Sequence, residues 1–469
     1  MREPIAGKFL LEILTKGMYS NPMHIYREYI QNACDSIDRA IAAGVLKTKG
    51  AEIHITIDDK ERSIVIKDNG VGIAQSDAKV KLMNVGASDK DGIKERGFRG
   101  IGRLGGLAYA EEVQFITSAS GDAMKTVMSC DCVRMQQLLQ KSNNETSDIM
   151  ETFSAISSFD EQPEDVDEHY FEVRLLGVSR ESGLLDENCV ISYISETAPV
   201  DFDSQQFSQA GKIRDAFCKK GFPITCYRIM RGERKKPIYK PYSRRMSTGK
   251  QERTKNKDYV RDVEFIYQEA SDGSPLYMGW LAITDFSGVI SEEAVQGIRF
   301  RKGNILVGNG TTFSKFFPSE GHNANRMFAG EIHILHDDLI PNSQRDDFEP
   351  NNIYSEMKSA LSEWAGIINK KYRRGTSEAT SALRNLNKLN EEQKQLEERI
   401  ESGAITSDEK REQISERLEQ ITRNRESEER KVRKALENGT FDSERKETVL
   451  KALSQTETAT KKVTTLNTK

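Results

Sequence analysis

The sequence predicts an α+β protein in which two sheet-containing domains are followed by a C-terminal helical hairpin. Three observations lead to this prediction. The first third of the chain alternates helical and strand patterns, a second group of strand patterns runs from about 258 to 350, and apolar residues after about 376 recur at helical spacing. At 469 residues the chain is too long for a single hydrophobic core, so separate domains are expected.

The first predicted domain places helices on one face of a mostly antiparallel sheet. Helices are expected near 6–18 and from about 22 to 43. Strands are expected at AEIHITID, SIVIKD and EEVQFITSA, and around 169–178 and 190–194. Strands grouped in this way beside a few helices are typical of an α+β layered domain.

The second predicted domain is also rich in strands. Its strand patterns are VEFIYQEA, LYMGWLAITDF, GIRFRKGNILVG and GEIHILHD. A helix is expected to follow at roughly 352–373. These elements predict a compact α/β domain between the basic stretch described below and the helical C-terminal part.

After about residue 376 the sequence predicts two helices that fold back on each other. Apolar residues recur at three- and four-residue intervals, with Glu, Lys, Arg and Gln between them. The segment ESGAITSDEK interrupts this pattern with a glycine, and Thr406 and Glu409 form a capping box that begins a new helix. A hairpin is therefore favoured over one long coiled coil. The Thr- and Lys-rich tail after about 455 is expected to be disordered.

These patterns predict five segments. A first domain covers 1–228, a basic linker or loop 229–257, a second domain 258–375, a helical hairpin or coiled coil 376–437, and a C-terminal segment 438–469.

The stretch 228–257 has the strongest local charge, with twelve Lys and Arg residues against two Glu, and with Tyr239 and Tyr242 interleaved. Two interpretations are open. The stretch is a solvated, mobile loop, or it contacts the phosphate backbone of a nucleic acid. The net charge of the whole chain, −4, indicates little about partners.

The composition excludes several classes of protein. The six cysteines are scattered, without a paired CxxC or a His cluster, so free thiols in a reducing compartment are expected and a structural zinc is not. The start MREPIAGKF has no apolar signal core, and no uncharged apolar run approaches the length of about 18 residues that a membrane span needs. A cytoplasmic protein with no membrane partner is expected.

The stretch REYIQNACDSI, from 27 to 37, carries polar residues on one helix face. Glu28 and Asn32 stand four residues apart, and Asp35 lies one turn from Asn32. Taken by itself, such a stripe is most often the solvent-exposed side of an amphipathic helix, and the alternative is that it points into a site.

Two glycine-containing stretches follow this helix. In KDNGVGI, Asp68 ends a strand and is followed by Gly70 and Gly72, which allow a sharp turn and the close approach of a ligand. The stretch RGFRGIGRLGG exposes many backbone amides and can surround a polyphosphate. Neither stretch follows the dinucleotide fingerprint, and the G-x-x-x-x-G-K-[ST] phosphate loop is absent from the sequence.

The helix motif, the Asp68 turn and the glycine-rich loop occur in this order and together resemble the GHKL ATPase superfamily. Its members include DNA gyrase B, MutL, histidine kinases, MORC proteins and the ninety-kilodalton heat-shock chaperones. Within it, YSNPMHIYREYIQNACDSID resembles the chaperone segment, whereas GFRG at 97–100 is similar to the MutL glycine box. The resemblance covers roughly 5–200. It implies a GHKL (Bergerat) ATPase sandwich over 1–228 and a transducer, or middle-like, domain over 258–375.

The resemblance implies that the cofactors are ATP and Mg²⁺, and it gives roles to the polar residues. Glu28 would be the general base that orients and deprotonates the attacking water. Asn32 would hold Mg²⁺, which offsets the charge of the phosphate oxygens. Asp68 would accept a hydrogen bond from the adenine amino group, and Asp35 and Asn84 would lie near the nucleotide.

The resemblance also implies that the glycine-rich segments surround the nucleotide. Gly70 and Gly72 would belong to the nucleotide-binding residues, because they let the ligand approach the backbone. The phosphates would be cradled by four backbone amides, those of Gly100, Ile101, Gly102 and Gly105. Lys90 and Arg103 would add positive charge, and the segment from about 74 to 97 would close over ATP as a lid.

A second match lies in the second domain. DLIPNSQRDDFE, at 338–349, resembles the catalytic loop of the chaperones' middle domain. The resemblance implies that Asn342 and Arg345 reach across to the γ-phosphate and couple the nucleotide state to domain docking.

One position departs from the family pattern. The family usually carries Gly-Thr at the start of a late strand, where the hydroxyl supports the adenine site. In EHYFEVRLLGV the corresponding pair is Glu168 and His169. The adenine pocket is therefore expected to be modified, and His169 is given no role.

The resemblance implies an ATP-hydrolysing conformational switch that forms a homodimer when ATP is bound and passes that state to a protein partner. The segment 258–375 is long enough for a transducer domain but shorter than the chaperones' middle domain. A nucleic-acid or phage-defence setting is supported only by the basic stretch at 228–257. Two alternatives stay open, a chaperone-like clamp on protein clients and a nucleotide-sensing scaffold with negligible turnover. Glu28 and Arg345 argue against the scaffold.

Overall fold

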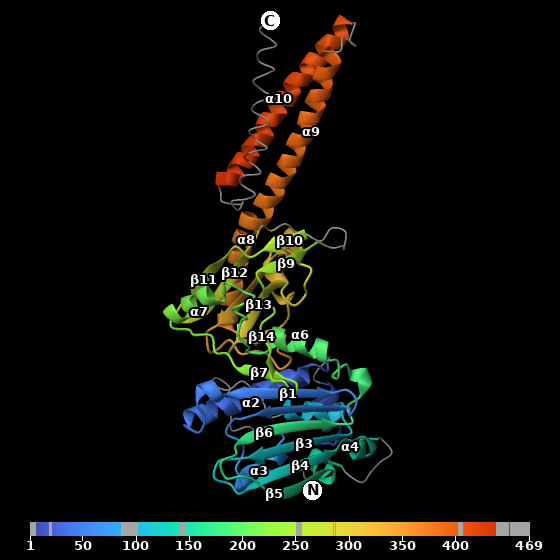
Figure 1. Ribbon diagram of the computed structural model, residues 1–469, viewed down its shortest axis with the longest axis vertical. Coiled ribbons are helices and arrows are strands. Elements are labelled where there is room, and N and C mark those ends of the chain that lie inside the picture. The colour runs from blue at the N-terminus through green and yellow to red at the C-terminus, as the bar shows by residue number, and fades with distance from the viewer. Residues whose placement is uncertain are drawn as a thin grey trace.

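The computed structural model describes residues 6–17, 21–85, 102–140, 147–249, 256–284, 286, 288–401, 407–437 and 450. Two sheet-containing domains lie one above the other, and a long helical hairpin extends from the second domain away from the first (Figure 1). The predicted α+β class and the C-terminal pair of helices are confirmed.

The first domain is built on an eight-stranded sheet whose order is β5-β4-β3-β6-β2-β1-β7-β8. Its neighbouring strands pair antiparallel, except β1 and β7, which are parallel. The strands are β1 (Glu52–Asp58), β2 (Ser63–Asp68), β3 (Glu112–Ser118), β4 (Met124–Asp131), β5 (Ser157–Pro163), β6 (Tyr170–Leu176), β7 (Arg228–Arg231) and β8 (Lys236–Pro237). The strands expected at AEIHITID, SIVIKD, EEVQFITSA and 169–178 are therefore confirmed.

Helices cover one face of this sheet, as predicted. The helix expected near 6–18 begins as α1 (Phe9–Glu12) and continues as a π-helical turn, Ile13–Gly17. The helix expected from 22 to 43 is α2 (His24–Ala42). The other helices of the domain are α3 (Gln75–Met83), α4 (Cys132–Leu138), α5 (Ile149–Ile156) and α6 (Glu187–Thr197).

The core of the first domain lies between α2 and the sheet. Alternate strand residues such as Ile64 and Ile66 point toward the helix, because side chains along a strand face opposite sides in turn. Tyr26, Ile30 and Ile37 of α2 meet them and are at most 2% exposed. This burial is the main reason why α2 holds a fixed position over the sheet.

The strand expected at 190–194 is wrong, because these residues lie inside α6. Asp186 caps the helix, and its side chain accepts hydrogen bonds from the amides of Asn188 and Cys189. Val190 and Ile194 stand four residues apart and are both buried, which is the spacing of a helix face. The β-branched residues favoured a strand, but the cap and the burial pattern favour the helix.

The basic stretch 229–257 differs from the linker or loop that was expected. Its first part forms β7 and β8, which extend the first sheet, and its second part forms β9 (Arg245–Thr248), which pairs with β10 (Asn256–Tyr259). Between them Lys240 is buried. The charges are therefore divided between two places, because β7 lies beside β1 whereas β9 and β10 lie in the second domain (Figure 1).

The second domain contains a five-stranded sheet of order β11-β12-β15-β13-β14. Only β13 and β15 run parallel among its paired strands. The strands are β11 (Asp262–Glu269), β12 (Pro275–Ile283), β13 (Gly297–Lys302), β14 (Ile305–Val307) and β15 (Ala329–Ile334). They cover the four strand patterns expected here.

A helix packs on each face of the second sheet. On one face lies α8 (Asn352–Ile368), the helix expected at 352–373, which buries Met357 and Leu361. On the other face lies α7 (Ala210–Lys219), whose Ile213 and Phe217 share a core with Trp280. Although α7 precedes residue 228, its apolar face belongs to the second domain.

The C-terminal helices α9 (Gly375–Glu401) and α10 (Asp408–Glu437) pack against each other along the hairpin (Figure 1). Leu386 and Val432 are buried between them, and Arg417 forms an ion pair with Glu392 across the pair. Except for residue 450, the C-terminal segment 438–469 lies outside the described residues, as does the predicted cap residue Thr406.

Candidate nucleotide site

The polar face of α2 is not a solvated surface. Glu28 is 8% exposed and Asp35 is 2% exposed, while Asn32 is half-buried between them along the helix. Carboxylates are rarely buried to this extent without a partner or a function. Of the two interpretations of REYIQNACDSI, the structure therefore favours the one in which the stripe points into a site.

Asp68 lies at the end of β2, in a tight turn that packs against α2. Its Oδ1 accepts a hydrogen bond of 2.8 Å from the amide of Gly70, and the amide of Val71 donates to the carbonyl oxygen of Ser36 on α2. Burial raises the pKa of Asp68 to about 7, although its hydrogen bonds with Gly70 and Ser36 act in the opposite direction.

The two glycines of this turn are required by space and by backbone conformation. A Cβ atom on Gly70 would lie 2.1 Å from Oγ of Ser36. Gly72 has a φ of +66°, and a Cβ atom there would lie 1.8 Å from the carbonyl oxygen of Ser118. The turn can therefore approach both α2 and β3 only because these positions lack side chains.

A threonine that the sequence analysis did not single out lies beside Asp68. Thr117 is buried on β3, and the strand register places Phe171 of β6 between Thr117 and Asp68, with all three on the face toward α2. Its Oγ1 accepts from the amide of Ile73 (2.8 Å) and donates to the carbonyl oxygen of Tyr170 (3.1 Å). The alternation in EVQFITS could have identified this hydroxyl, because it puts Thr117 on the core face at the end of the strand.

His169 is the residue that the resemblance sets against the family's Thr, and the structure places it beside the Asp68 turn. Its Nδ1 lies 2.8 Å from the carbonyl oxygen of Gly70, so a proton on Nδ1 is donated to the turn that follows Asp68. The neighbouring Glu168 is exposed. An imidazole therefore lies against the Asp68 turn, and two hydroxyls lie close by, that of Ser36 on α2 and that of Thr117 on β3.

The described part of the glycine-rich loop is a 3₁₀ segment, Gly102–Ala108, that lies directly on α2. A Cβ atom on Gly102 would lie 2.3 Å from Oε2 of Glu28. Further along, Oη of Tyr29 donates to the carbonyl oxygen of Arg103 and accepts from the amide of Gly106, both at 3.1 Å. The loop backbone therefore runs next to the carboxylate of Glu28.

The remaining predicted residues of this region fall into two groups. Lys90, Gly100 and Ile101 lie outside the described residues, as do the GFRG box and most of the predicted lid beyond α3. Arg103 donates to the carbonyl oxygens of Leu82 and Asn84 at the end of α3, and burial lowers its pKa. Gly105 packs on α2, where an added Cβ atom would lie 3.4 Å from the side chain of Ile25.

The loop at 338–349 brings the second domain to the same carboxylate. Nε of Arg345 lies 3.9 Å from Oε1 of Glu28, and each side chain is 11% exposed. Arg27 approaches from α2, with its Nη2 3.7 Å from Oε1 of Glu28 and 3.5 Å from the carbonyl oxygen of Gln344. Glu28 is thus the meeting point of two guanidinium groups, one from each domain.

Asn342 is placed differently from Arg345. Its Nδ2 donates to Oδ1 of Asp346 and its Oδ1 accepts from the amide of Asp346, while its carbonyl oxygen accepts from the amide of Arg345. Asn342 therefore braces the loop that carries Arg345, which has a φ of +56°. Such a conformation is strained for a residue with a side chain and needs surrounding contacts to hold it.

The residues present fit a magnesium ion only in part. The amide oxygen of Asn32 is a suitable hard ligand, and it lies one turn from Glu28 on α2. In the described ranges, no group of three or more His, Cys, Asp and Glu residues could hold a metal ion. A magnesium ion held at Asn32 would therefore take its other ligands from phosphate oxygens and water, as is usual for this ion.

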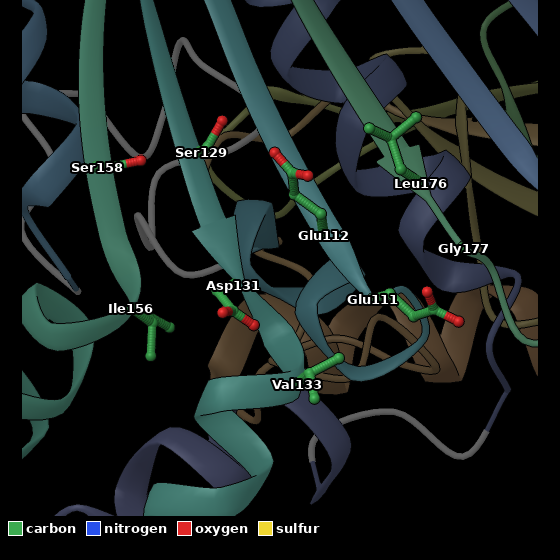
Figure 2. A pocket seen from close by; sticks show the side chains of 9 residues that line it. All are labelled: Glu111, Glu112, Ser129, Asp131, Val133, Ile156, Ser158, Leu176 and Gly177. Carbon is green, nitrogen blue, oxygen red and sulfur yellow. The ribbon is translucent and has the colours of Figure 1, made fainter.

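A separate pocket lies on the outer face of the first sheet, away from α2 (Figure 2). It is lined by Glu111, Glu112, Ser129, Asp131, Val133, Ile156, Ser158, Leu176 and Gly177. Its carboxylates have structural partners. Glu111 pairs with Arg62, Glu112 accepts from Gln114, and Asp131 caps α4. The pocket is separate from the candidate nucleotide site, because it opens on the opposite face of β3 from Thr117.

Within the described residues, no helix is long and apolar enough to cross a membrane.

Comparisons with known proteins agree with this geometry. Residues 24–162 match the family described as histidine kinase-, DNA gyrase B-, and HSP90-like ATPase. The domain that contains α2 and the Asp68 turn is therefore a GHKL ATPase domain. The match confirms the resemblance to the GHKL superfamily seen in the sequence, and the relatives given next confirm its resemblance to the HSP90 group.

Chaperones named HtpG, which belong to the HSP90 family, are among the relatives of this chain. The chaperone protein HtpG of Acinetobacter baylyi is 33% identical over 92 residues, which cover 18% of this chain and 14% of that protein. HtpG of Aliarcobacter butzleri is 36% identical over 93 residues, with the same coverage. HtpG of Mycobacterium tuberculosis is 30% identical over 140 residues, covering 25% of this chain and 21% of that protein. The chain therefore matches only a small part of the length of these relatives.

Proposed function

We propose that the protein binds and hydrolyses ATP, and that nucleotide in the first domain controls how the second domain docks through Arg345. The observation that carries this proposal is the approach of Arg345 to Glu28, 3.9 Å between Nε and Oε1. A general base and a cation that meet at one point are two of the parts that enzymes use to transfer a phosphoryl group to water.

The adenine ring of ATP is assigned to a pocket at the Asp68 turn. The carboxylate of Asp68 hydrogen-bonds with the amide of Gly70 and with Ser36, and because a carboxylate offers about four lone-pair sites it can accept a further hydrogen bond from an exocyclic amino group. Phe171 and Thr117 lie beside Asp68 on the same face of the sheet. An apolar ring and a few fixed polar groups are the usual lining of such a pocket.

The phosphates are assigned to the loop between the Asp68 turn and β3. The backbone at Gly102 passes within reach of Glu28, so a terminal phosphate held by that loop would lie near the carboxylate. Glu28 would orient and deprotonate the attacking water. A magnesium ion at Asn32 would supply charge neutralisation of the phosphate oxygens.

Arg345 would then act in two ways. A γ-phosphate beside Glu28 competes with the carboxylate for the guanidinium of Arg345, and developing charge on the phosphate favours the phosphate contact. Since Arg345 belongs to the second domain, this exchange of partners would report the nucleotide state to the rest of the chain.

The decisive experiment compares the full chain with its Glu28→Ala variant. Wild-type protein should release inorganic phosphate from ATP only when Mg²⁺ is added. The variant should bind ATP with an unchanged dissociation constant but lose turnover by about 100-fold or more. Turnover that survives this substitution would show that Glu28 is not the base.

The consequence of turnover is a second part of the proposal. We infer an ATP-dependent homodimer that passes its state to a protein partner, and a chaperone-like clamp on protein clients is the alternative that the names of the HtpG relatives favour. A clamp of this kind should suppress aggregation of an unfolded client in an ATP-dependent manner. Sedimentation with and without a non-hydrolysable ATP analogue tests the homodimer.

The hypothesis of a nucleic-acid partner, including a phage-defence setting, is supported by the exposed basic residues of the hairpin between β7 and β8. Arg234, Lys235 and Lys236 are exposed there, at the edge of the first sheet. Changing Lys235, Lys236, Arg244 and Arg245 to Glu should abolish salt-sensitive binding of DNA or RNA while ATP hydrolysis is kept. If wild-type protein does not bind either nucleic acid at low salt, this setting is excluded.

A further inference from the structure

A cluster of buried charges lies in the second domain, where it meets the first. Glu331 of β15 has no exposed surface, and its two carboxylate oxygens accept from Nε of Arg301 and from Nζ of Lys240, each at 2.6 Å. Lys240 also donates to Oδ1 of Asn304. Removing charges from water is costly, so such a cluster persists only where its geometry is well satisfied.

Arg301 uses its other nitrogens to hold the first domain. Nη2 donates to the carbonyl oxygen of Glu196 (2.8 Å), and Nη1 lies 3.5 Å from the carbonyl oxygen of Ala198. Both carbonyls are at the C-terminal end of α6, whose Val190 and Ile194 belong to the core of the first domain. A cation at this end of a helix also interacts favourably with the helix dipole.

The strand pair that carries Arg301 also holds Arg345. Arg301 lies on β13, which turns through Asn304 into β14, and the carbonyl oxygen of Asn304 accepts from Nη1 of Arg301. Immediately after β14, the amide of Gly308 donates to the carbonyl oxygen of Arg345 (2.8 Å). The β13–β14 hairpin therefore contacts the first domain at α6 through Arg301, and Gly308, which follows the hairpin, contacts the loop that carries Arg345.

We propose that Arg301 is a positioning residue that sets the place of Arg345 relative to Glu28. The inference rests on the proposed function, and it identifies the residue that fixes the position of Arg345 in the site. Glu28 is carried by α2 and the docking carbonyls by α6, and these two helices pack against each other in the first domain. Fixing β13 and β14 on α6 therefore fixes the distance from Gly308, and so from Arg345, to α2.

Rigid spacing of this kind matters because a displacement of about 1 Å can lower a rate about 100-fold. The backbone strain at Arg345 adds to the argument, since its φ of +56° has to be maintained by contacts. The bond from Gly308 is one of them, and Gly308 itself has a φ of +74°. The loop would relax if its anchor moved.

The test is Arg301→Lys, which keeps the charge facing Glu331. Arg301 contacts Glu331, the carbonyl of Asn304 and the carbonyl of Glu196 through three separate nitrogens of its planar fork, and the one ammonium group of Lys does not reproduce that spread of contacts. We expect kcat for ATP to fall about 10- to 100-fold with the dissociation constant of a non-hydrolysable ATP analogue unchanged within about twofold. Arg326→Lys, at an exposed arginine of the same domain, is the matched control and should keep wild-type kcat.

Two further measurements separate positioning from a general loss of structure. When Arg301→Lys is combined with Arg345→Ala, kcat should fall no further than in Arg345→Ala, because a positioning residue acts only through the residue it positions. Hydrogen exchange at the amide of Gly308 should be about tenfold faster in Arg301→Lys than in wild-type protein. This exchange measurement needs no ATP turnover, so it decides the inference even if the proposed function fails.

Gly308→Ala provides a second variant if Arg301→Lys does not fold. It leaves the charged cluster intact, but its Cβ atom would lie 2.1 Å from Oγ1 of Thr312 and 2.9 Å from the carbonyl oxygen of Asp346 in the loop. It should lower kcat with unchanged affinity for the analogue. The inference would be overturned if the fold-losses of kcat from Arg301→Lys and Arg345→Ala multiplied in the double variant. Unchanged hydrogen exchange at the amide of Gly308 in Arg301→Lys would overturn it as well.

Discussion

The guanidinium of Arg345 lies against the carboxylate of Glu28, 3.9 Å from Nε to Oε1, in a setting where about nine tenths of each side chain is shielded from water. The two residues come from different domains and from distant parts of the chain. Their approach joins the GHKL ATPase domain to the second domain at the point where hydrolysis is proposed to occur. If nucleotide controls domain docking, Nε of Arg345 and Oε1 of Glu28 are the atoms through which the two are connected.

Replacing Arg345 with Ala should lower kcat for ATP hydrolysis by about 100-fold or more, while the dissociation constant of ATP changes by less than about threefold. The reason is that the guanidinium meets developing phosphate charge chiefly in the transition state, whereas the base pocket at Asp68 supplies most of the ground-state binding. Phosphate release under single-turnover conditions, together with equilibrium binding of a non-hydrolysable analogue, measures both quantities.

Arg261→Ala is a suitable control for that substitution, because Arg261 is an exposed arginine of the second domain remote in sequence from the loop at 338–349. Its kcat should equal that of the wild type. If Arg345→Ala instead weakens ATP binding in the same proportion as it lowers kcat/KM, Arg345 contributes to ground-state binding and not to the catalytic step.

Asp68→Asn should weaken ATP binding by about 100-fold and at the same time stabilise the protein at alkaline pH. Burial raises the pKa of Asp68 to about 7 from a usual value of 3.8. The folded state therefore holds a proton that the unfolded state has lost, and stability falls as the pH rises from about 4 to about 7. A shift of about three units corresponds to a loss of roughly 4 kcal/mol, which a neutral Asn does not suffer.

Urea unfolding at pH 5 and pH 8 tests this expectation. The unfolding free energy of Asp68→Asn should exceed that of the wild type at pH 8, and the difference should shrink at pH 5. ATP binding should fall by about 100-fold, because an Asn that keeps its oxygen on the Gly70 amide turns its own amino group toward the amino group of adenine. Equal pH dependence in the two proteins would show that Asp68 is not the group that titrates.

Local patterns in the sequence predicted the helix and strand framework of the site, and the family resemblance supplied the chemistry. The places of Glu28, Asn32 and Asp68 could be predicted because local patterns put the first two on a helix, α2, and the third at the end of a strand, β2. The chemistry needed the glycine-rich loop and the loop at 338–349 as well. The strand expected at 190–194 failed because β-branched residues also occur on buried helix faces, and the signal that decides between the two is the cap at Asp186.

Long-range pairings were the part that the sequence could not predict. In the sequence Lys240 was one of the twelve basic residues of the stretch 228–257. In the structure it is buried and forms an ion pair with Glu331. Thr117 was an ordinary strand residue until the register of β3 and β6 placed it beside the Asp68 turn. Such contacts depend on which strands are neighbours, and local periodicity carries no information about that.

Thr117→Val should weaken the base pocket, and Thr117→Ser should restore it. The hydroxyl of Thr117 accepts from the amide of Ile73 and donates to the carbonyl oxygen of Tyr170. Valine has nearly the same shape but leaves both buried backbone groups without this partner, at a cost of about 1–3 kcal/mol. Thermal unfolding should show the loss in Val and its recovery in Ser, and ATP affinity should follow the same order. If Thr117→Val and Thr117→Ser bind ATP with equal affinity, the hydroxyl of Thr117 does not contribute to the nucleotide site.

Gly102→Ala should impair catalysis more than folding. Its Cβ atom would lie 2.3 Å from Oε2 of Glu28, so the carboxylate has to move, and a side chain moves more easily than a backbone. We expect kcat to fall about 10- to 100-fold, with a change in unfolding free energy of less than about 1.5 kcal/mol.

Gly211→Ala is the matched control for this glycine. It lies in α7, where an added Cβ atom would meet none of the described atoms within 4 Å, and alanine is favoured over glycine in a helix. It should keep wild-type kcat and gain up to about 1 kcal/mol of stability. If Gly102→Ala keeps the wild-type kcat while its stability is also unchanged, the carboxylate of Glu28 can shift without consequence. A general base that has to be held beside the attacking water does not tolerate such freedom, so that result would remove Glu28 from the catalytic role.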